Sequence, residues 1–247
     1  MSFYEFLVNL AVKYRDNAFV KALFGKPYHY YLVYKAKQFH KREKANFKKY
    51  ALDAISTLDE CLTRNGFPYS LATGTLLGAV REKGFIPHDE DIDIFMWIED
   101  YSPRLIDELS KVGIKLDHSY SIENDKLGKE DSFKYKGVQI DIFYIYPAID
   151  DYPYFTDYFV FHDSPTKALS VKRHGGLMPR RLQLPIKKQF MRVPFECIEL
   201  PICINAHEVL QFRYGLNYMI PNAKWMAGDF NPNVTEWPEK VGYITTY

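Results

Sequence analysis

Hydrophobic and polar positions alternate most clearly at Asp91-Ile92-Asp93-Ile94. A period of two predicts a strand with both carboxylates on one face and both isoleucines on the other. A second strand is predicted over residues 138–146, where β-branched and aromatic residues surround Asp141. We expect the two strands to be neighbours, so that Asp91, Asp93 and Asp141 lie together.

Helical spacing of apolar residues dominates the first part of the chain. It predicts an amphipathic helix over residues 2–24, a break at Lys26-Pro27, and one or two helices over residues 30–65 that stop at Asn65-Gly66. A short strand at 69–72 and a glycine turn from Gly74 to Gly78 follow. The remaining predicted elements are helices at 76–82, 105–112 and 205–214, strands at 114–118 and 152–161, a hairpin joining 133–135 to 138–146, and an extended loop after Pro221.

The chemistry of the glycine turn and the acidic cluster points to phosphate and metal. A glycine lets backbone N–H groups approach phosphate oxygens closely, so we expect Gly74 and Thr75 to bind nucleotide phosphates. Carboxylates placed side by side repel each other, and a fold that gathers them usually puts a cation between them. Oxygen ligands suit Mg²⁺, bound as one or two ions, with Mn²⁺ as a substitute.

These motifs, in this order, resemble the LicD family of phosphotransferases, which includes the fukutin-related proteins. Its superfamily signature is a Gly-Ser or Gly-Thr turn, an acidic-x-acidic pair and a third acidic residue on a later strand. Gly74-Thr75, Asp91-x-Asp93 and Asp141 match it. The later segment FRYGLNYMIPN is similar to a C-terminal element of the family. The chain departs from the family at His88, where an aromatic residue is usual.

The resemblance implies a fold and a division of the chain. The fold would be α+β, with the mixed β-sheet core of the nucleotidyltransferase fold flanked by helices. Residues 1–65 would form an N-terminal helical segment packed on the core. Residues 66–247 would form the catalytic domain with a LicD-type C-terminal extension.

The resemblance also implies roles for individual residues. Asp91 and Asp93 would bind Mg²⁺, and Asp141 would bind a second ion or accept a proton from the acceptor hydroxyl. Arg81 and Lys83 would neutralise the diphosphate. Residues expected to contact substrate are His88, Asp89, Tyr214 and Tyr218.

Several of these residues have an equally simple structural interpretation. His88 would then be a structural or solvent-facing residue, Asp89 and Glu90 would only shape a loop, and the tyrosines would pack in the core. A basic run could line a channel for an anionic substrate or form a solvated face. It comprises Arg180, Arg181, Lys187 and Lys188.

The activity implied by the resemblance is transfer of a phospho-substituent, phosphocholine by default, from a CDP-activated alcohol. The acceptor would be a sugar hydroxyl of a cell-surface glycan or lipid-linked oligosaccharide, and CMP would be released. Related branches imply ribitol phosphate, glycerol phosphate, phosphoethanolamine or an aminoalkylphosphonate. Two alternatives stay open: a nucleotidyltransferase that attaches NMP to a small molecule or protein, and a non-catalytic partner in glycan assembly.

Composition narrows the remaining choices. The 247 residues are 47% hydrophobic, enough for a sizeable core, and 32 basic against 31 acidic residues predict no affinity for nucleic acid. Three cysteines without metal-ligand spacing indicate reduced thiols. With no signal-peptide pattern and no apolar stretch of about 20 residues, we expect a cytoplasmic protein. Its N-terminal helix would pack on the domain or contact the inner face of a membrane.

Overall fold

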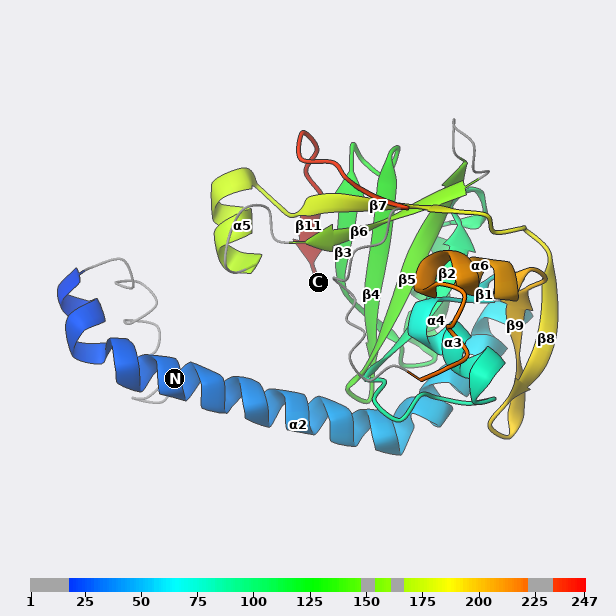
Figure 1. Ribbon diagram of the computed structural model, residues 1–247, viewed down its shortest axis with the longest axis horizontal. Coiled ribbons are helices and arrows are strands. Elements are labelled where there is room, and N and C mark those ends of the chain that lie inside the picture. Colours follow the sequence, from blue (N-terminus) through cyan, green and yellow to red (C-terminus); the bar gives the residue numbers. More distant parts are fainter. Residues whose placement is uncertain (1–17, 148–153, 161–166, 222–232) are drawn as a thin grey trace. The chain divides into compact units, whose positions relative to one another are not determined.

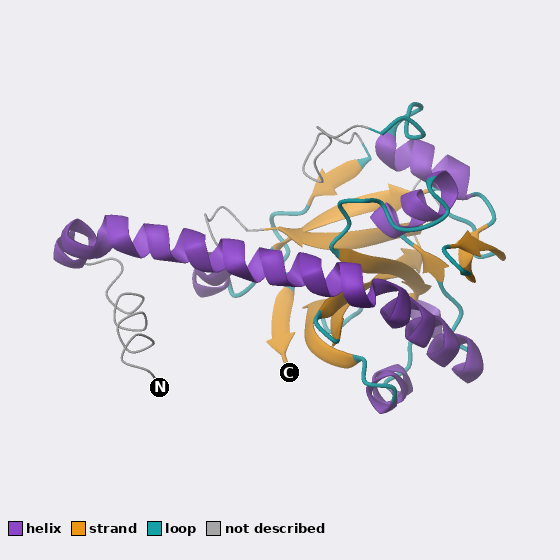
Figure 2. Ribbon diagram, turned by 90° about the horizontal axis from the view of Figure 1, so that it is seen from below, coloured by secondary structure: helices purple, strands orange, loops and turns teal. Residues whose placement is uncertain are grey.

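The computed structural model describes residues 18–147, 154–160, 167–221 and 233–247 and has mixed α+β architecture (Figures 1 and 2). The chain divides into two compact units, residues 1–45 and 46–247, and helix α2 (Ala18–Asn65) contributes to both. Residues 2–17 of the first predicted helix lie outside the described residues. The assignment of 1–65 and 66–247 as functional parts stays a prediction.

The predicted helix break at Lys26-Pro27 is wrong, because α2 is helical through this position. A proline inside a helix removes one hydrogen bond and crowds the preceding turn. That local cost does not stop the helix where the residues on both sides favour it. Strong helix formers precede the proline at Ala22, Leu23 and Lys26, and Leu32 follows it.

The second unit is built around a nine-stranded sheet, counted over the described residues. Seven strands follow the order β10-β7-β6-β5-β4-β3-β11; β2 pairs with β5 outside this path, and β1 pairs with β2. A separate hairpin is formed by β8 (Phe190–Phe195) and β9 (Ile198–Cys203). The sheet strands are β1 (Ser70–Leu71), β2 (Asp91–Trp97), β3 (Lys115–Ile122), β4 (Gly128–Tyr135), β5 (Val138–Pro147), β6 (Tyr154–Val160), β7 (Met178–Leu184), β10 (Val234–Glu236) and β11 (Tyr243–Thr246).

The hairpin of β4 and β5 and the parallel pairing of β5 with β2 set the register around the acidic residues. Lys136 and Gly137 both have positive φ, 49° and 83°, which suits the tight turns that match strand twist. On its other side β5 runs parallel to β2, with Asp93 opposite Asp141. The predicted strands and their adjacency are therefore confirmed.

Three strands of the sheet were missed: β7, and two strands in the tail that the sequence marks as an extended loop. β10 pairs with β7, and β11 pairs with β3 at the sheet edge. β10 and β11 are short, and each has one partly buried side chain while the others are exposed. An edge strand of this kind carries little hydrophobic pattern, and its pairing is decided by the neighbouring strand.

In the described part of the chain after α2, five helical elements accompany the sheet: α3 (Thr73–Arg81), the 3₁₀ helix η1 (Ile98–Asp100), α4 (Arg104–Lys111), α5 (Lys167–His174) and α6 (Ala206–Tyr214). Helix α3 packs against β2, and α6 packs against α3 (Figure 1). The core includes one face of α2 after residue 46 and the inward isoleucines of β2 and β5.

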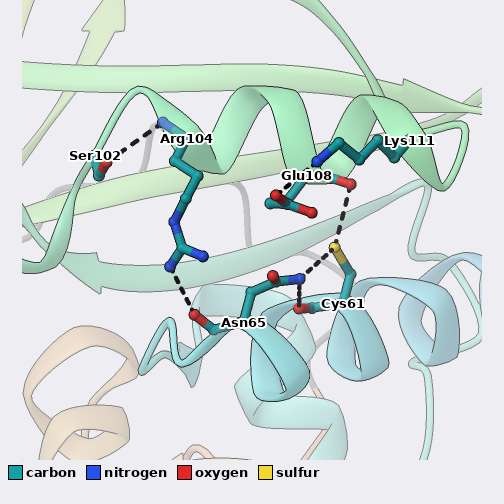
Figure 3. A network of polar contacts seen from close by, with 6 residues as sticks. All are labelled: Cys61, Asn65, Ser102, Arg104, Glu108 and Lys111. Carbon is teal, nitrogen blue, oxygen red and sulfur yellow. Dashed lines mark hydrogen bonds and ion pairs between the residues drawn. The ribbon is translucent and has the colours of Figure 1, made fainter.

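Polar contacts join α4 to the end of α2 (Figure 3). The Arg104 guanidinium donates to the carbonyl of Asn65 at 2.9 Å, and the Cys61 thiol donates to the carbonyl of Glu108 at 3.4 Å. Asn65 also donates to the carbonyl of Cys61 at 2.9 Å. Side chains thus bond the carbonyl groups of Cys61 and Asn65 near the end of α2, and backbone N–H groups bond those of Leu62 and Thr63.

None of the described helices is both long and apolar enough to cross a membrane.

Candidate active site

Three aspartates converge at the junction of β2 and β5. Asp91 and Asp93 alternate with buried isoleucines on β2, so both point to the same face. The parallel register places Asp141 of β5 directly opposite Asp93. One carboxylate oxygen from each residue lies within 4.8 Å of the others. The structure therefore brings together the three acidic residues that the sequence singled out.

Two of the three aspartates, Asp93 and Asp141, are held by neighbouring polar groups. The Thr73 hydroxyl donates to Asp93 Oδ2, and Thr75 Oγ1 accepts the backbone N–H of Asp93 at 3.0 Å. Asp141 accepts from Ser132 at 2.6 Å on one oxygen and from Gln139 at 2.8 Å on the other. Sequence reasoning missed Thr73, Ser132 and Gln139. Their signal was weak: polar residues at alternating strand positions or next to a glycine.

The electrostatics of the cluster favour a bound cation. Burial, then repulsion from Asp141, raises the pKa of Asp91 to about 6. Burial, then repulsion from Asp91 and Asp141, raises the pKa of Asp93 well above its usual range. Burial also raises the pKa of Asp141, although bonds from Ser132 and Gln139 oppose this. A divalent cation would relieve the repulsion, and the all-oxygen donor set fits Mg²⁺ or Mn²⁺.

Helix α3 begins beside the triad, three residues before the predicted start. Gly74 and Thr75 are therefore in the first helical turn and not in a separate turn. The N-cap residue, Ala72, makes no side-chain capping bond. A Cβ on Gly74 would lie 3.3 Å from Asp89 Oδ1, so the glycine leaves room for Asp89, on the loop that enters β2, to approach the helix. Backbone N–H groups at a helix start favour anions such as phosphate.

With this geometry in place, comparison with known proteins identifies the family. The sequence model described as LicD/FKTN/FKRP, nucleotidyltransferase domain, matches residues 66–201, more than half of the chain. The chain belongs to this family.

Among its relatives, ribitol-5-phosphate transferase FKTN of Mus musculus is 28% identical over 204 residues, which are 79% of this chain and 40% of that protein. Lipopolysaccharide cholinephosphotransferase LicD of Haemophilus influenzae is 30% identical over 146 residues, 54% of this chain and 51% of that protein. The chain thus spans about half or less of the length of these LicD-family relatives.

Asp89 and His88 lie on the loop that enters β2. Asp89 Oδ2 accepts the backbone N–H of Ile86 at 3.0 Å, which fixes the loop, and burial raises the pKa of Asp89 to about 6. Its approach to Gly74 also places it next to the start of α3. His88 is exposed. Asp89 therefore shapes the loop and lies beside the triad, whereas His88 faces solvent.

Arg81 and Lys83, the two cations expected near the phosphates, differ in their contacts. Arg81 bonds Glu82 at 2.7 Å and the carbonyl of Tyr218 at 3.3 Å, so it connects α3 to the segment after α6. Lys83 is exposed, and its carbonyl accepts the N–H of Glu196 at 2.7 Å. Their proposed phosphate contacts stay a prediction.

Arg213, in the last turn of α6, is a cation that sequence reasoning did not select. It lies close enough to oppose the rise in the pKa of Asp93. Its guanidinium is 5.5 Å from the ring centroid of Tyr214. The available signal was its place at the head of the family's C-terminal element, where only the tyrosines were chosen.

The two tyrosines of this element differ in their surroundings. Burial raises the pKa of Tyr214, and the charges of Asp93 and Asp89 act on it in the same direction, so Tyr214 lies beside the acidic cluster. Tyr218 is buried, and its hydroxyl contacts His207 Nδ1. Tyr214 thus lies beside the acidic cluster, while Tyr218 packs in the core.

The basic run after α5 does not form a continuous patch of unpaired charge. Arg180 pairs with Glu236 at 2.7 Å, Arg181 pairs with Asp157 at 2.9 Å, and Lys188 pairs with Asp100 at 2.7 Å. These ion pairs join different elements of the fold. A structural role accounts for them, and the idea of a channel for an anionic substrate gains no support from these contacts.

Proposed function

We propose that this chain is a Mg²⁺-dependent transferase that moves a phospho-substituent from a CDP-activated alcohol to a sugar hydroxyl of a glycan and releases CMP. The observation that carries the proposal is the convergence of three aspartate oxygens within 4.8 Å beside the first turn of α3. Family membership supports the reaction class. The same features support a nucleotidyltransferase-type core, which we include in the proposal.

The residues divide the work of such a reaction. Asp91, Asp93 and Asp141 would hold Mg²⁺, which when bound neutralises charge on the diphosphate. The N–H groups at the start of α3 would bind phosphate oxygens, and Arg213 would add positive charge next to Asp93. Because phosphoryl transfer depends mainly on positioning and charge neutralisation, these groups supply most of what it needs.

The names of two relatives suggest two candidates for the donor head group. The LicD relative is named a cholinephosphotransferase, and the FKTN relative is named a ribitol-5-phosphate transferase. We propose phosphocholine first and ribitol phosphate as its competitor. Tyr214 could meet a choline group through its aromatic face, since such faces attract quaternary ammonium ions. A glycan acceptor and a cytoplasmic or membrane-peripheral location stay predictions.

The test is a donor panel of CDP-choline, CDP-ethanolamine, CDP-ribitol, CDP-glycerol and CTP, each with and without Mg²⁺. A donor at about 100 times its Kd stabilises a protein by about 2.7 kcal/mol, or about 5–10 °C at this chain length. We expect one CDP-alcohol to give this shift only with Mg²⁺ and to yield CMP. Asp93→Asn should abolish both effects. Asp107→Asn is the matched control, because Asp107 is exposed on α4.

Other outcomes would select the alternatives. Stabilisation by CTP alone, without CMP release, favours a nucleotidyltransferase. A protein that binds none of these nucleotides, with or without Mg²⁺, favours a non-catalytic partner in glycan assembly. Retained transfer in Asp93→Asn refutes the proposed metal site.

A further inference from the structure

Glu130 is a buried carboxylate on the same face of the sheet as the triad. In the antiparallel register of β4 and β5, Ser132 is opposite Asp141. Glu130, two residues from Ser132 on β4, is opposite Phe143, two residues from Asp141 on β5. Paired residues and every second residue share a face, so Glu130 and Asp141 point to the same side. Glu130 is only 8% exposed, and its Oε2 has no hydrogen-bond partner among the described residues.

The adjacent residue shows how this fold satisfies a carboxylate that serves structure alone. Asp131 points to the opposite face and is fully buried. It accepts from Ser119 at 2.6 Å and from Tyr144 at 2.8 Å, and Lys129 lies 3.1 Å away. An unpaired buried polar atom is costly, and native structures keep few of them. The open oxygen of Glu130, on the triad's side, is therefore best explained by a ligand.

The surroundings of Glu130 suit a polar molecule with an apolar face. Tyr120 of β3 is opposite Glu130, and Phe159 stacks on the Tyr120 ring at 4.7 Å between centroids. The Lys167 ammonium, at the start of α5, lies 5.2 Å from the centre of the same ring. Lys167 and Glu130 influence each other electrostatically, but no ion pair joins them in the described part of the chain. Aromatic rings combined with a few charged groups are typical of sites that bind polar ligands such as sugars.

The proton of an acceptor hydroxyl needs a group with an open oxygen. Both oxygens of Asp141 already accept hydrogen bonds, from Ser132 and from Gln139. Burial, then repulsion from Asp141 and Asp93, raises the pKa of Glu130, whereas Lys167 opposes this. A carboxylate whose pKa is raised toward the operating pH is a stronger base than an exposed one.

We propose that Glu130, flanked by Tyr120 and Lys167, binds the acceptor hydroxyl next to the triad and takes its proton. This inference rests on the proposed function. In the step, the acceptor oxygen forms a bond to the phosphorus that carries the alcohol. The bond from that phosphorus to the oxygen of CMP breaks, and CMP leaves with the electron pair. The hydroxyl proton moves to Glu130 and then to solvent.

The experiment compares the wild type with Glu130→Gln and Glu130→Ala, and with Glu123→Gln as a matched control. Glu123 lies in the turn between β3 and β4, where its half-exposed side chain pairs with Lys240. Donor binding is followed by Mg²⁺-dependent thermal shift. CMP release is measured with water as the acceptor and with the methyl glycosides of glucose, galactose and N-acetylglucosamine. Water serves as a probe because its deprotonation needs the same base.

We expect Glu130→Gln to keep the donor-dependent thermal shift and to lose at least 100-fold in CMP release. Its unfolding temperature without donor should equal or exceed that of the wild type, because a neutral amide replaces an unpaired buried carboxylate. Formate, which fits the space of the deleted group, should restore release in Glu130→Ala and not in Glu130→Gln.

Four results would overturn the assignment. Loss of the donor-dependent shift in Glu130→Gln would make Glu130 part of the donor or metal site. Release within threefold of the wild type, or no rescue of a donor-binding Glu130→Ala by formate, would remove its role as base. A wild type that releases no CMP from any donor would refute the proposed function, and the base assignment with it.

Discussion

The buried ion pair between Arg181 of β7 and Asp157 of β6 allows a sharp test of the fold. Arg181 Nε and Nη2 bond the two oxygens of Asp157 at 2.9 and 3.0 Å, and Nη2 also donates to the carbonyl of Leu127 at 2.9 Å. The Asp157 side chain is 0% exposed. The neighbouring Arg180 pairs with Glu236 instead, where the side chains are 31% and 54% exposed. Arg181→Met and Arg180→Met thus make the same change in buried and exposed settings.

The expected magnitudes differ because solvent screens one pair and not the other. Removing one partner of a buried pair leaves an uncompensated charge and costs about 3–5 kcal/mol. An exposed pair contributes about 0–1 kcal/mol. Arg181 also stacks on Phe155, 3.7 Å from its ring centre, and that contact is lost as well. At this chain length we expect Arg181→Met to lower the unfolding temperature by about 6–20 °C.

Urea and thermal unfolding of the two variants measure the difference. Burial raises the pKa of Asp157 and Arg181 opposes this, so the pKa rises further in Arg181→Met. When a carboxyl has a higher pKa in the folded state than in the unfolded state, the free energy of unfolding falls as pH rises above the unfolded value, here 3.8. The cost of Arg181→Met should therefore be larger at pH 8 than at pH 5. Adding Asp157→Asn should recover part of it. Equal costs for the two methionine variants would refute this account.

Three further predictions follow from other parts of the structure. Asp93→Asn should unfold at the same or a higher temperature than the wild type without Mg²⁺, because it removes one of three repelling carboxylates; a large loss in thermal unfolding would contradict this. Gly78→Ala should destabilise the protein by about 1–3 kcal/mol, although alanine normally favours a helix, because its Cβ would lie 2.4 Å from the backbone carbonyl of Gly84. Urea unfolding decides the sign, and stabilisation would refute the close packing. At pH 8, iodoacetamide should label the exposed Cys197 of the native protein and spare the buried Cys61 and Cys203, since burial raises the pKa of Cys203 to about 11. Mass spectrometry of the peptides measures the labelling of each cysteine. Fast labelling of Cys203 would show that β9 opens.

Hydrophobic periodicity was sufficient to predict a strand where the segment has one buried face. The alternation at Asp91-Ile92-Asp93-Ile94 and the β-branched run around Asp141 produced the correct strands, since both bury their isoleucines completely. Periodicity was insufficient where pairing with a neighbouring strand decides whether a segment becomes a strand. β10 and β11 have no buried side chain and are strands because β7 and β3 offer them hydrogen-bond partners. Helix α3 also starts earlier than its apolar residues indicate.

The sequence by itself determined the family's motif, the identity of the three aspartates and the faces on which they lie, because these depend on local order along the chain. The tertiary structure alone decided the parallel register that sets Asp141 opposite Asp93, and the placement of Arg213 and Tyr214 beside them. It also separated Glu130 from Asp131, two adjacent acidic residues of which one is satisfied and the other open. The physical reason is that burial and hydrogen-bond partners come from segments distant in sequence, and no local pattern records which segments will meet.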